Sequence, residues 1–174
     1  IILLEGSPEG KSMRFIYREL GYDFPRVLAL DVKDCVLVEV ENPLSKPFAL
    51  STFWLPNVLL SCDYLIVITP FKIFDNRGSF SIESLLGLLP VSKYKGEAEY
   101  GWGTLYSLGI QQVIADLYFT LPFDLGIIDA RKKFIGGEDP TKERIEEYGK
   151  IFVGEPYEVD REASRAGGVE TEYL

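Results

Sequence analysis

The chain has 174 residues, of which 47% are apolar, a formal net charge of −9 and no histidine. A chain of this length and apolar content can bury a substantial core, so we expect one domain covering 1–174. The lack of histidine excludes Ser-His-Asp and Cys-His relays, and the acidic charge disfavours binding to the phosphate backbone of nucleic acids.

Strand-like runs occur along the whole chain. The run at 35–40 is rich in β-branched residues and leads through Asn42-Pro43 to another strand, as in an antiparallel excursion. The predicted strands lie at 1–4, 26–30, 35–40, 47–53, 64–69, 125–128 and 150–153.

Helical patterns alternate with these strands. Gly21 stands where a first helix would stop, and Asp160 is expected to cap the first turn of the last helix. Predicted helices lie at 10–20, 81–89, 104–119 and 156–166, with a short turn or helical piece at 56–61 and a solvated helix at 138–149. This alternation predicts an α/β fold, a three-layer sandwich around a mixed, mainly parallel sheet.

Two glycine-containing segments have alternative interpretations. The stretch 6–12 follows a strand and opens a helix like a phosphate-binding loop, but Gly6 and Gly10 are separated by three residues instead of four. It predicts a plain turn, with weak anion binding at the helix N-terminus as the alternative. The aromatic stretch 94–106 is predicted either to form a lid or subunit interface, or to fold its rings back into the core.

The two cysteines, Cys35 and Cys62, are too few for a Cys-only zinc site or for an iron–sulfur cluster within the chain. Any metal would have to be a hard cation such as Mg²⁺, held by carboxylates and water, and no other cofactor is indicated. Charged residues, among them Asp63 and Asp75, interrupt the most apolar region, so we predict no membrane span and a cytoplasmic protein.

Two of the predicted strands lead directly into charged residues. Strand 64–69 is followed by Pro70-Phe71-Lys72, and strand 125–128 by Asp129 and a basic run. Ligands in open α/β sheets bind beyond the carboxyl ends of the strands, so we expect a cleft there. Lys72 and Asp129 are the candidate catalytic residues, as cation or base and as its partner or Mg²⁺ ligand; an ordinary ion pair is the alternative.

Neighbouring loops supply further candidates. The polar loop 75–77 could close over a ligand, although Asp-Asn-Arg-Gly is equally typical of a turn. Two glycines after the basic run allow close backbone approach or a tight loop. The complete set of ligand-binding candidates is Lys72, Asp75, Asn76, Arg77, Asp129, Arg131, Gly136 and Gly137.

Several short motifs follow one another along most of the chain. They are Glu5-Gly6-Ser7, Cys62-Asp63-Tyr64-Leu65-Ile66-Val67 with Pro70 and Lys72, Leu86-Gly87-Leu88-Leu89-Pro90, Ile114-Ala115-Asp116-Leu117, Ile127-Ile128-Asp129 and Val159-Asp160. In this order they resemble the domain of unknown function 362 family. Members occur in bacteria and archaea, alone or joined to ferredoxin-like iron–sulfur modules, so the resemblance implies an iron–sulfur protein as a partner but no biochemical role.

The chain departs from that family's pattern in two motifs. It has Pro70-Phe71-Lys72-Ile73-Phe74 where members have Pro-x-x-Lys-Thr-His, and Glu83-Ser84 where they have Lys-Asn. Members also carry a strand and helix before the Glu-Gly-Ser region, whereas this chain opens on Ile1 in a strand-like run. The resemblance therefore implies a diverged or N-terminally truncated member, and we expect the natural chain to begin earlier. The ion-rich, glutamine-poor composition is typical of a thermophile.

Two hypotheses of function follow from these observations. In the first, a locally positive cleft around Lys72 and Asp129 binds a small anionic metabolite, with or without Mg²⁺. In the second, the chain is a non-catalytic interaction domain that binds an iron–sulfur protein or forms a homodimer. The second hypothesis predicts a wide apolar surface and association in solution.

Overall fold

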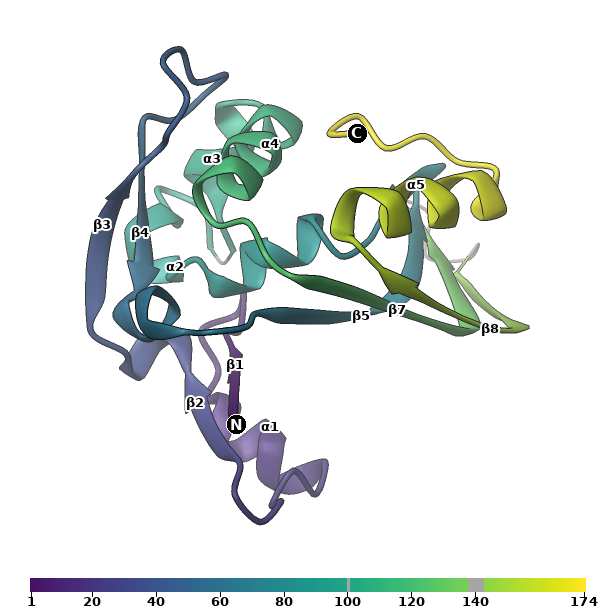
Figure 1. Ribbon diagram of the computed structural model, residues 1–174, viewed down its shortest axis with the longest axis horizontal. Helices are drawn as coiled ribbons and strands as arrows, with labels where there is room; N and C mark the ends of the chain where they lie inside the picture. The colour runs from purple at the N-terminus through teal and green to yellow at the C-terminus, as the bar shows by residue number, and fades with distance from the viewer. Residues whose placement is uncertain (100, 138–142) are drawn as a thin grey trace. The chain divides into compact units, whose positions relative to one another are not determined.

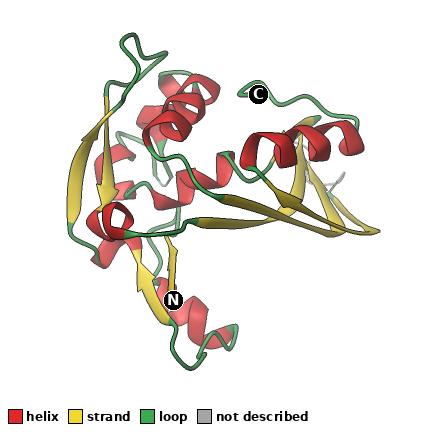
Figure 2. Cartoon of the chain, viewed as in Figure 1, coloured by secondary structure: helices red, strands yellow, loops and turns green. Residues whose placement is uncertain are grey.

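The computed structural model describes residues 1–99, 101–137 and 143–174 (Figure 1). The chain divides into two compact units, each built from two segments of sequence. Unit 1 contains Ile1–Cys62 and Leu86–Thr120, and unit 2 contains Asp63–Leu85 and Leu121–Leu174. Both units combine helices and strands (Figure 2), which confirms an α/β protein. The expected single domain stays a prediction.

Unit 1 begins with a strand, a helix and a second strand that pairs in parallel with the first, as predicted. The carboxylate of Asp31 accepts a hydrogen bond from the backbone N–H of Met13 at 2.8 Å and ties the start of the helix to the end of the second strand. The elements are β1 (Ile2–Glu5), α1 (Met13–Glu19), β2 (Leu28–Asp31) and the 3-10 helix η1 (Val32–Asp34).

The connection from β1 to α1 is a turn. The N–H of Gly10 donates to the carbonyl of Ser7 at 3.0 Å, and the Glu5 carboxylate accepts from the N–H of Gly6 at 3.0 Å. An acid at the entrance of this loop makes it unfavourable for phosphate.

The rest of unit 1 is an antiparallel hairpin and a group of short helices. The antiparallel pairing and the helical piece after it are confirmed, but the second strand, expected at 47–53, is Thr52–Pro56. The single helix expected at 104–119 is instead divided at Gly109, whose φ of 92° does not occur within a right-handed helix. The elements are β3 (Leu37–Glu41), β4 (Thr52–Pro56), η2 (Asn57–Ser61), α2 (Val91–Tyr94), α3 (Gly103–Ser107) and α4 (Ile110–Thr120). Within the described residues, no helix has the length and apolar character needed to cross a membrane.

The aromatic stretch contributes to the core of unit 1. Tyr94 is buried, and its hydroxyl oxygen accepts a hydrogen bond from the backbone N–H of Trp54 at 2.7 Å. The indole N–H of Trp102 donates to the carbonyl of Leu89 at 2.9 Å. Tyr94 and Trp102 therefore fold back into unit 1, as the second of the two interpretations predicted, whereas Tyr106 is exposed.

Unit 2 is a four-stranded sheet with one helix on one of its faces (Figure 1). The strand order is β6-β5-β7-β8, in which β5 and β7 are parallel and the other two pairs are antiparallel. Phe71, Ile128, Val159 and Ala163 belong to the core between sheet and helix. The elements are β5 (Ile66–Phe74), β6 (Arg77–Ser79), β7 (Leu125–Gly136), β8 (Arg144–Gly154) and α5 (Pro156–Gly167), and the 3-10 helix η3 (Glu83–Leu88) runs across the sequence boundary between the units.

The strand pairing corrects part of the expected architecture. The described strands form three separate sheets with two parallel and three antiparallel pairs. Mixed pairing is therefore confirmed, but a single, mainly parallel sheet is not what these strands form. Parallel neighbours need a long crossover, whereas β3 with β4 and β5 with β6 are joined by short connections that favour antiparallel pairing.

Two predicted strands continue well past their expected C-terminal ends. The strand expected at 64–69 continues to Phe74, and the one expected at 125–128 continues to Gly136. In the first extension, buried Phe71 and Ile73 alternate with exposed Lys72 and Phe74, which is the period of a half-buried strand. Both strands change register at this point through bulges after Pro70 and Ala130.

The solvated helix expected at 138–149 is wrong over its described part. Residues 138–142 lie outside the described residues, and 144–149 belong to β8. This segment pairs with β7, with Phe134 opposite Ile145 and a cross-strand ion pair of 3.5 Å between Lys132 and Glu147. Sheet pairing therefore overrides the helical character of its glutamates.

Candidate functional site

Lys72 lies within β5 and not beyond its end. Its side chain is exposed on the face of the sheet opposite α5, because its neighbours Phe71 and Ile73 point into the core. Across the strands it lies opposite Ser79 on β6 and Phe134 on β7. The predicted strand-end position of Lys72 is therefore wrong.

Asp129 is also a residue within a strand, opposite Pro70 of β5 and Ile151 of β8. Its partner is Arg131: Nε donates to Oδ1 at 2.9 Å, and Nη2 donates to Oδ2 at 2.6 Å. These hydrogen bonds and the guanidinium charge hold the pKa of Asp129 at about 2. The structure thus brings these two candidates together as an ordinary surface ion pair, with 35% of the Asp129 side chain exposed.

Replacing Arg131 with alanine is expected to raise the pKa of Asp129 from about 2 toward its ordinary value of 3.8, because the three side-chain hydrogen bonds from the guanidinium are lost. A ¹³C NMR titration of the Asp129 carboxyl carbon measures this change. Lys132→Ala is the control, since Lys132 pairs with Glu147. An unchanged Asp129 titration in the Arg131 variant would show that the bidentate pair does not form in solution.

The polar loop of the prediction is a tight turn. Asp75 and Asn76 have φ values of 47° and 63°, and Phe74 lies opposite Arg77 in the strand pairing. Two residues with positive φ between antiparallel strands correspond to a type I′ turn, in which Asn and Asp are favoured. Arg77 extends toward the C-terminal segment, where Nη1 lies 3.6 Å from Oε1 of Glu172. The turn interpretation of this loop is supported by these features.

The two glycines after the basic run lie beside the same turn. The carbonyl of Gly136 accepts a hydrogen bond from the N–H of Asp75 at 3.2 Å. A Cβ atom on Gly137 would collide with the carboxylate of Asp75, whereas one on Gly136 would meet only ordinary contacts. The close approach is thus to a side chain of the neighbouring turn, which agrees with the tight-loop interpretation.

Metal ligands are not gathered in the described part of the chain. Among the described residues, no group of three or more Asp, Glu or Cys side chains is arranged to hold a metal ion. Mg²⁺ binding stays a prediction.

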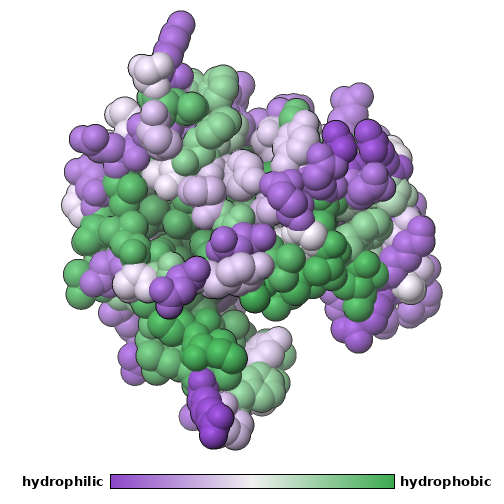
Figure 3. Space-filling model, viewed as in Figure 1, coloured by the Kyte–Doolittle hydropathy of each residue, from purple (hydrophilic) through white to green (hydrophobic). Residues whose placement is uncertain are grey.

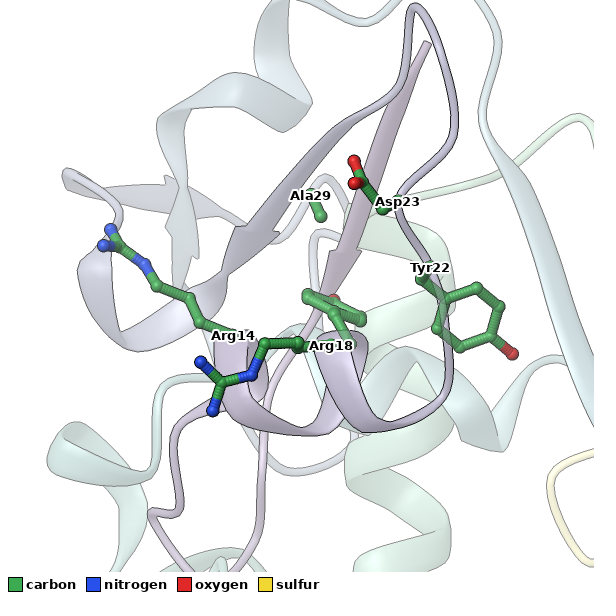
Figure 4. A pocket seen from close by; sticks show the side chains of 6 residues that line it. Arg14, Arg18, Tyr22, Asp23 and Ala29 are labelled. Atoms are coloured by element: carbon green, nitrogen blue, oxygen red, sulfur yellow. The ribbon is translucent and has the colours of Figure 1, made fainter.

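A shallow hollow of about 430 Å³ lies beside α1 in unit 1 (Figure 4). Arg14 on its wall is paired with Asp34 at 3.1 Å, and the guanidinium of Arg18 lies 5.6 Å from the centre of the Phe15 ring. The hollow is lined by Arg14, Tyr17, Arg18, Tyr22, Asp23 and Ala29. The lining carries both charge signs, with Arg14 and Arg18 beside Asp23.

The open face of the unit 2 sheet carries a surface that sequence reasoning missed. We call it the open-face patch, and Figure 3 shows hydrophobic surface over β5, β7 and β8. By strand register, Ile68 lies opposite Ile127, and Ile127 lies opposite Val153. The exposed fractions are 69% for Ile68 and 58% for Val153. The patch consists of Ile66, Ile68, Ile127, Ile151 and Val153.

The one signal for this patch in the sequence is the period-two spacing of isoleucine and valine residues. Ile66 and Ile68 are separated by Val67, and Ile151 and Val153 by Phe152, so both faces of each strand are apolar. Such runs normally indicate strands buried on both faces. The structure covers one face only, which leaves the other exposed.

Comparison with known protein families, with curated proteins and with solved structures finds no match to this chain. The resemblance to the domain of unknown function 362 family therefore stays a prediction, and the site must be interpreted from its own geometry.

Proposed function

We propose that the chain is a non-catalytic interaction module that forms a homodimer through the open-face patch. The observation that carries the proposal is the alignment of Ile68, Ile127 and Val153 across three neighbouring strands on the face opposite α5. A contiguous apolar surface of this kind on a protein is typical of an interaction site.

The size of the apolar face fits a second copy of the chain. Beyond the bulges, the register continues the face through Phe134 opposite Lys72 and Ile145 opposite Phe134. Phe74, Phe134 and Ile145 are 54%, 39% and 61% exposed, so they extend the apolar surface toward the ~800 Å² that each partner contributes to an interface of standard size.

The charges around the patch also permit self-association. Asp129 is paired with Arg131, and Lys132 with Glu147, so these four charges cancel; Lys72, exposed on the same face, adds one positive charge, although the whole chain has a net charge of −9. Two copies therefore meet without concentrated like charge, and the remaining repulsion between acidic bodies is screened by salt.

The proposal predicts a dimer that a single charge on the patch abolishes. Sedimentation equilibrium of the unaltered chain should give twice the chain mass, with association strengthened by added salt. Ile68→Lys should shift the protein to the monomer, because the interface would have to bury an unpaired ammonium group.

The matched control is Val36→Lys. Val36 is β-branched and 68% exposed, against 69% for Ile68, but it lies in unit 1 outside the patch. This variant should remain dimeric. A monomeric unaltered chain at all accessible concentrations, or an Ile68→Lys variant that still dimerises, would contradict the proposal.

The remaining sequence-based expectations are kept as proposals. Lys72 and Asp129 lie within strands and not beyond their ends. This position makes the hypothesis of anion binding at these residues weaker. An iron–sulfur protein as partner, a cytoplasmic location, a thermophilic bacterial or archaeal source and a three-layer arrangement rest on sequence alone.

A further inference from the structure

The C-terminal segment Val169–Leu174 turns back from α5 (Figure 1) and lies along the edge of β6, the outermost described strand on that side of the unit 2 sheet. Gly168 has a φ of 64° and ends α5 in the left-handed conformation. The N–H of Gly78 donates to the carbonyl of Glu170 at 3.1 Å, and Glu170 forms a parallel bridge with Arg77. The segment therefore extends the sheet by a short stretch of parallel chain.

The surface that receives this segment includes Asp160, a fully buried carboxylate on α5. Its Oδ1 accepts from the N–H and the hydroxyl of Ser81 at 2.9 and 2.5 Å, and its Oδ2 accepts from the N–H of Ile82 at 2.9 Å. These three donors lie outside the segment, so the body of unit 2 holds the carboxylate in position by itself. Asp160 is thus not the helix cap that was expected; the cap is Glu155, which accepts from the N–H of Glu158 at 2.9 Å.

Two side chains of the segment contact charged groups of this surface. The hydroxyl of Tyr173 donates to Oδ2 of Asp160 at 3.1 Å, and Oε1 of Glu172 lies 3.6 Å from Nη1 of Arg77. A hydrogen bond to a carboxylate is about twice as strong as one between neutral groups, so Tyr173 is the main polar anchor. The guanidinium of Arg77 favours an acidic segment.

The start of the segment supplies an apolar anchor. The side chain of Val169 packs against the unit 2 core, and its carbonyl accepts a hydrogen bond from the hydroxyl of Ser164 on α5 at 2.5 Å. Extended peptides are recognised in this way when they add to a sheet edge: main-chain hydrogen bonds give affinity, and side-chain contacts give specificity. The segment thus contacts unit 2 as a bound peptide contacts its receptor.

We propose that unit 2 has a docking site for an extended acidic peptide, and that Val169–Leu174 occupies this site as an internal cover. We call it the edge site, and it consists of Arg77, Gly78, Asp160 and Ser164. A partner that replaces the cover presents the same chemistry: an apolar residue, with a glutamate and a tyrosine three and four residues after it. The edge site shares no residue with the open-face patch, so it is a second interaction surface.

The tether decides how the edge site is occupied. Because only Gly168 separates the segment from α5, the segment is present at the site at an effective concentration on the order of millimolar or higher. A free peptide therefore competes poorly with the intact segment. Weakening the contacts of the segment should shift occupation of the site to a peptide supplied in solution.

Fluorescence anisotropy of a labelled peptide with the sequence of residues 168–174 tests the edge site in the full chain. A double variant with Glu172→Gln and Tyr173→Phe weakens the internal cover and leaves the edge site itself unaltered. The peptide should bind this double variant at least about tenfold more tightly than it binds the unaltered chain. A peptide of the same composition in scrambled order should not bind.

Further substitutions identify the groups that recognise the peptide. A peptide with phenylalanine in place of Tyr173 should bind the double variant about tenfold more weakly, because the donor to Asp160 is lost. Arg77→Ala in the double variant should also weaken binding, whereas Arg144→Ala should not. The side chains of Arg77 and Arg144 are similarly exposed, 54% and 60%, but Arg144 lies in β8 at the other end of the strand order.

The proposal is overturned if the double variant does not bind the native peptide, or binds the scrambled peptide or the peptide without the tyrosine hydroxyl equally well. Equal weakening by Arg77→Ala and Arg144→Ala would also overturn it. Because the edge site lies outside the open-face patch, these results do not depend on whether the chain dimerises.

Discussion

Replacing Asp116 with alanine is expected to lower the free energy of unfolding of unit 1 by about 3–5 kcal/mol. Asp116 is a fully buried residue of α4 whose carboxylate accepts three backbone hydrogen bonds. The donors are the N–H groups of Phe48, Ala49 and Leu50, at 3.0, 2.6 and 2.9 Å. Alanine would leave all three donors without their acceptor, and such bonds to a charged group are about twice as strong as neutral ones.

Tryptophan fluorescence during urea unfolding measures this loss. Both tryptophans, Trp54 and Trp102, belong to unit 1, so the signal reports on this unit. Gln112→Ala is the control, because Gln112 is exposed on the same helix, and its cost should stay within about 0.5 kcal/mol. If Asp116→Ala costs no more than Gln112→Ala, the clamp between α4 and the 48–50 segment does not contribute to stability.

The elements that sequence reasoning located well are those with local signals. The strand–helix–strand order of the first thirty residues and the antiparallel pair β3 and β4 are confirmed. The last helix is also confirmed at Pro156–Gly167, because Pro stands at its start and Gly168 at its left-handed end. Each of these signals acts within a few residues.

The elements that were misassigned depend on distant partners. Residues 144–149 contain glutamates typical of a helix, yet β7 supplies a pairing surface that the local pattern does not contain. Lys72 and Asp129 were also misplaced because of a distant partner. Their strands continue past the bulges because β5 and β7 pair with each other on both sides of the register shift. A predicted cleft built on strand ends therefore fails when the ends lie elsewhere.

The candidate surface could be predicted only in part. Sequence reasoning allowed a wide apolar patch for an interaction domain, with the aromatic stretch 94–106 as one possible subunit interface, but Tyr94 is buried and Trp102 is hydrogen-bonded in unit 1. The apolar run of β5 is typical of a strand buried on both faces. The path of α5 decides which face of the sheet is covered. The alternation of residues within β5 does not encode that path.

Phe71→Ala is expected to cost unit 2 about 3–5 kcal/mol, since it removes a fully buried aromatic ring and leaves a cavity. The Phe71 ring packs against Phe80, Tyr148 and Phe152, with ring centres 5.0, 5.9 and 6.1 Å away. Phe74→Ala is the matched control: the same substitution three residues later in β5, on the opposite face, where 54% of Phe74 is exposed.

The two variants also test the extension of β5 beyond the predicted strand end. Urea unfolding followed by far-UV circular dichroism, in protein diluted to the monomer, compares their stabilities without a contribution from dimerisation. Phe74→Ala should cost less than about 1 kcal/mol, because an exposed ring leaves no cavity. If the strand ended at Thr69, as predicted from sequence, and 70–74 lay beyond it, the two substitutions would have similar, small effects. A large difference between them therefore requires the strict alternation of a half-buried strand, and with it the exposed position of Lys72.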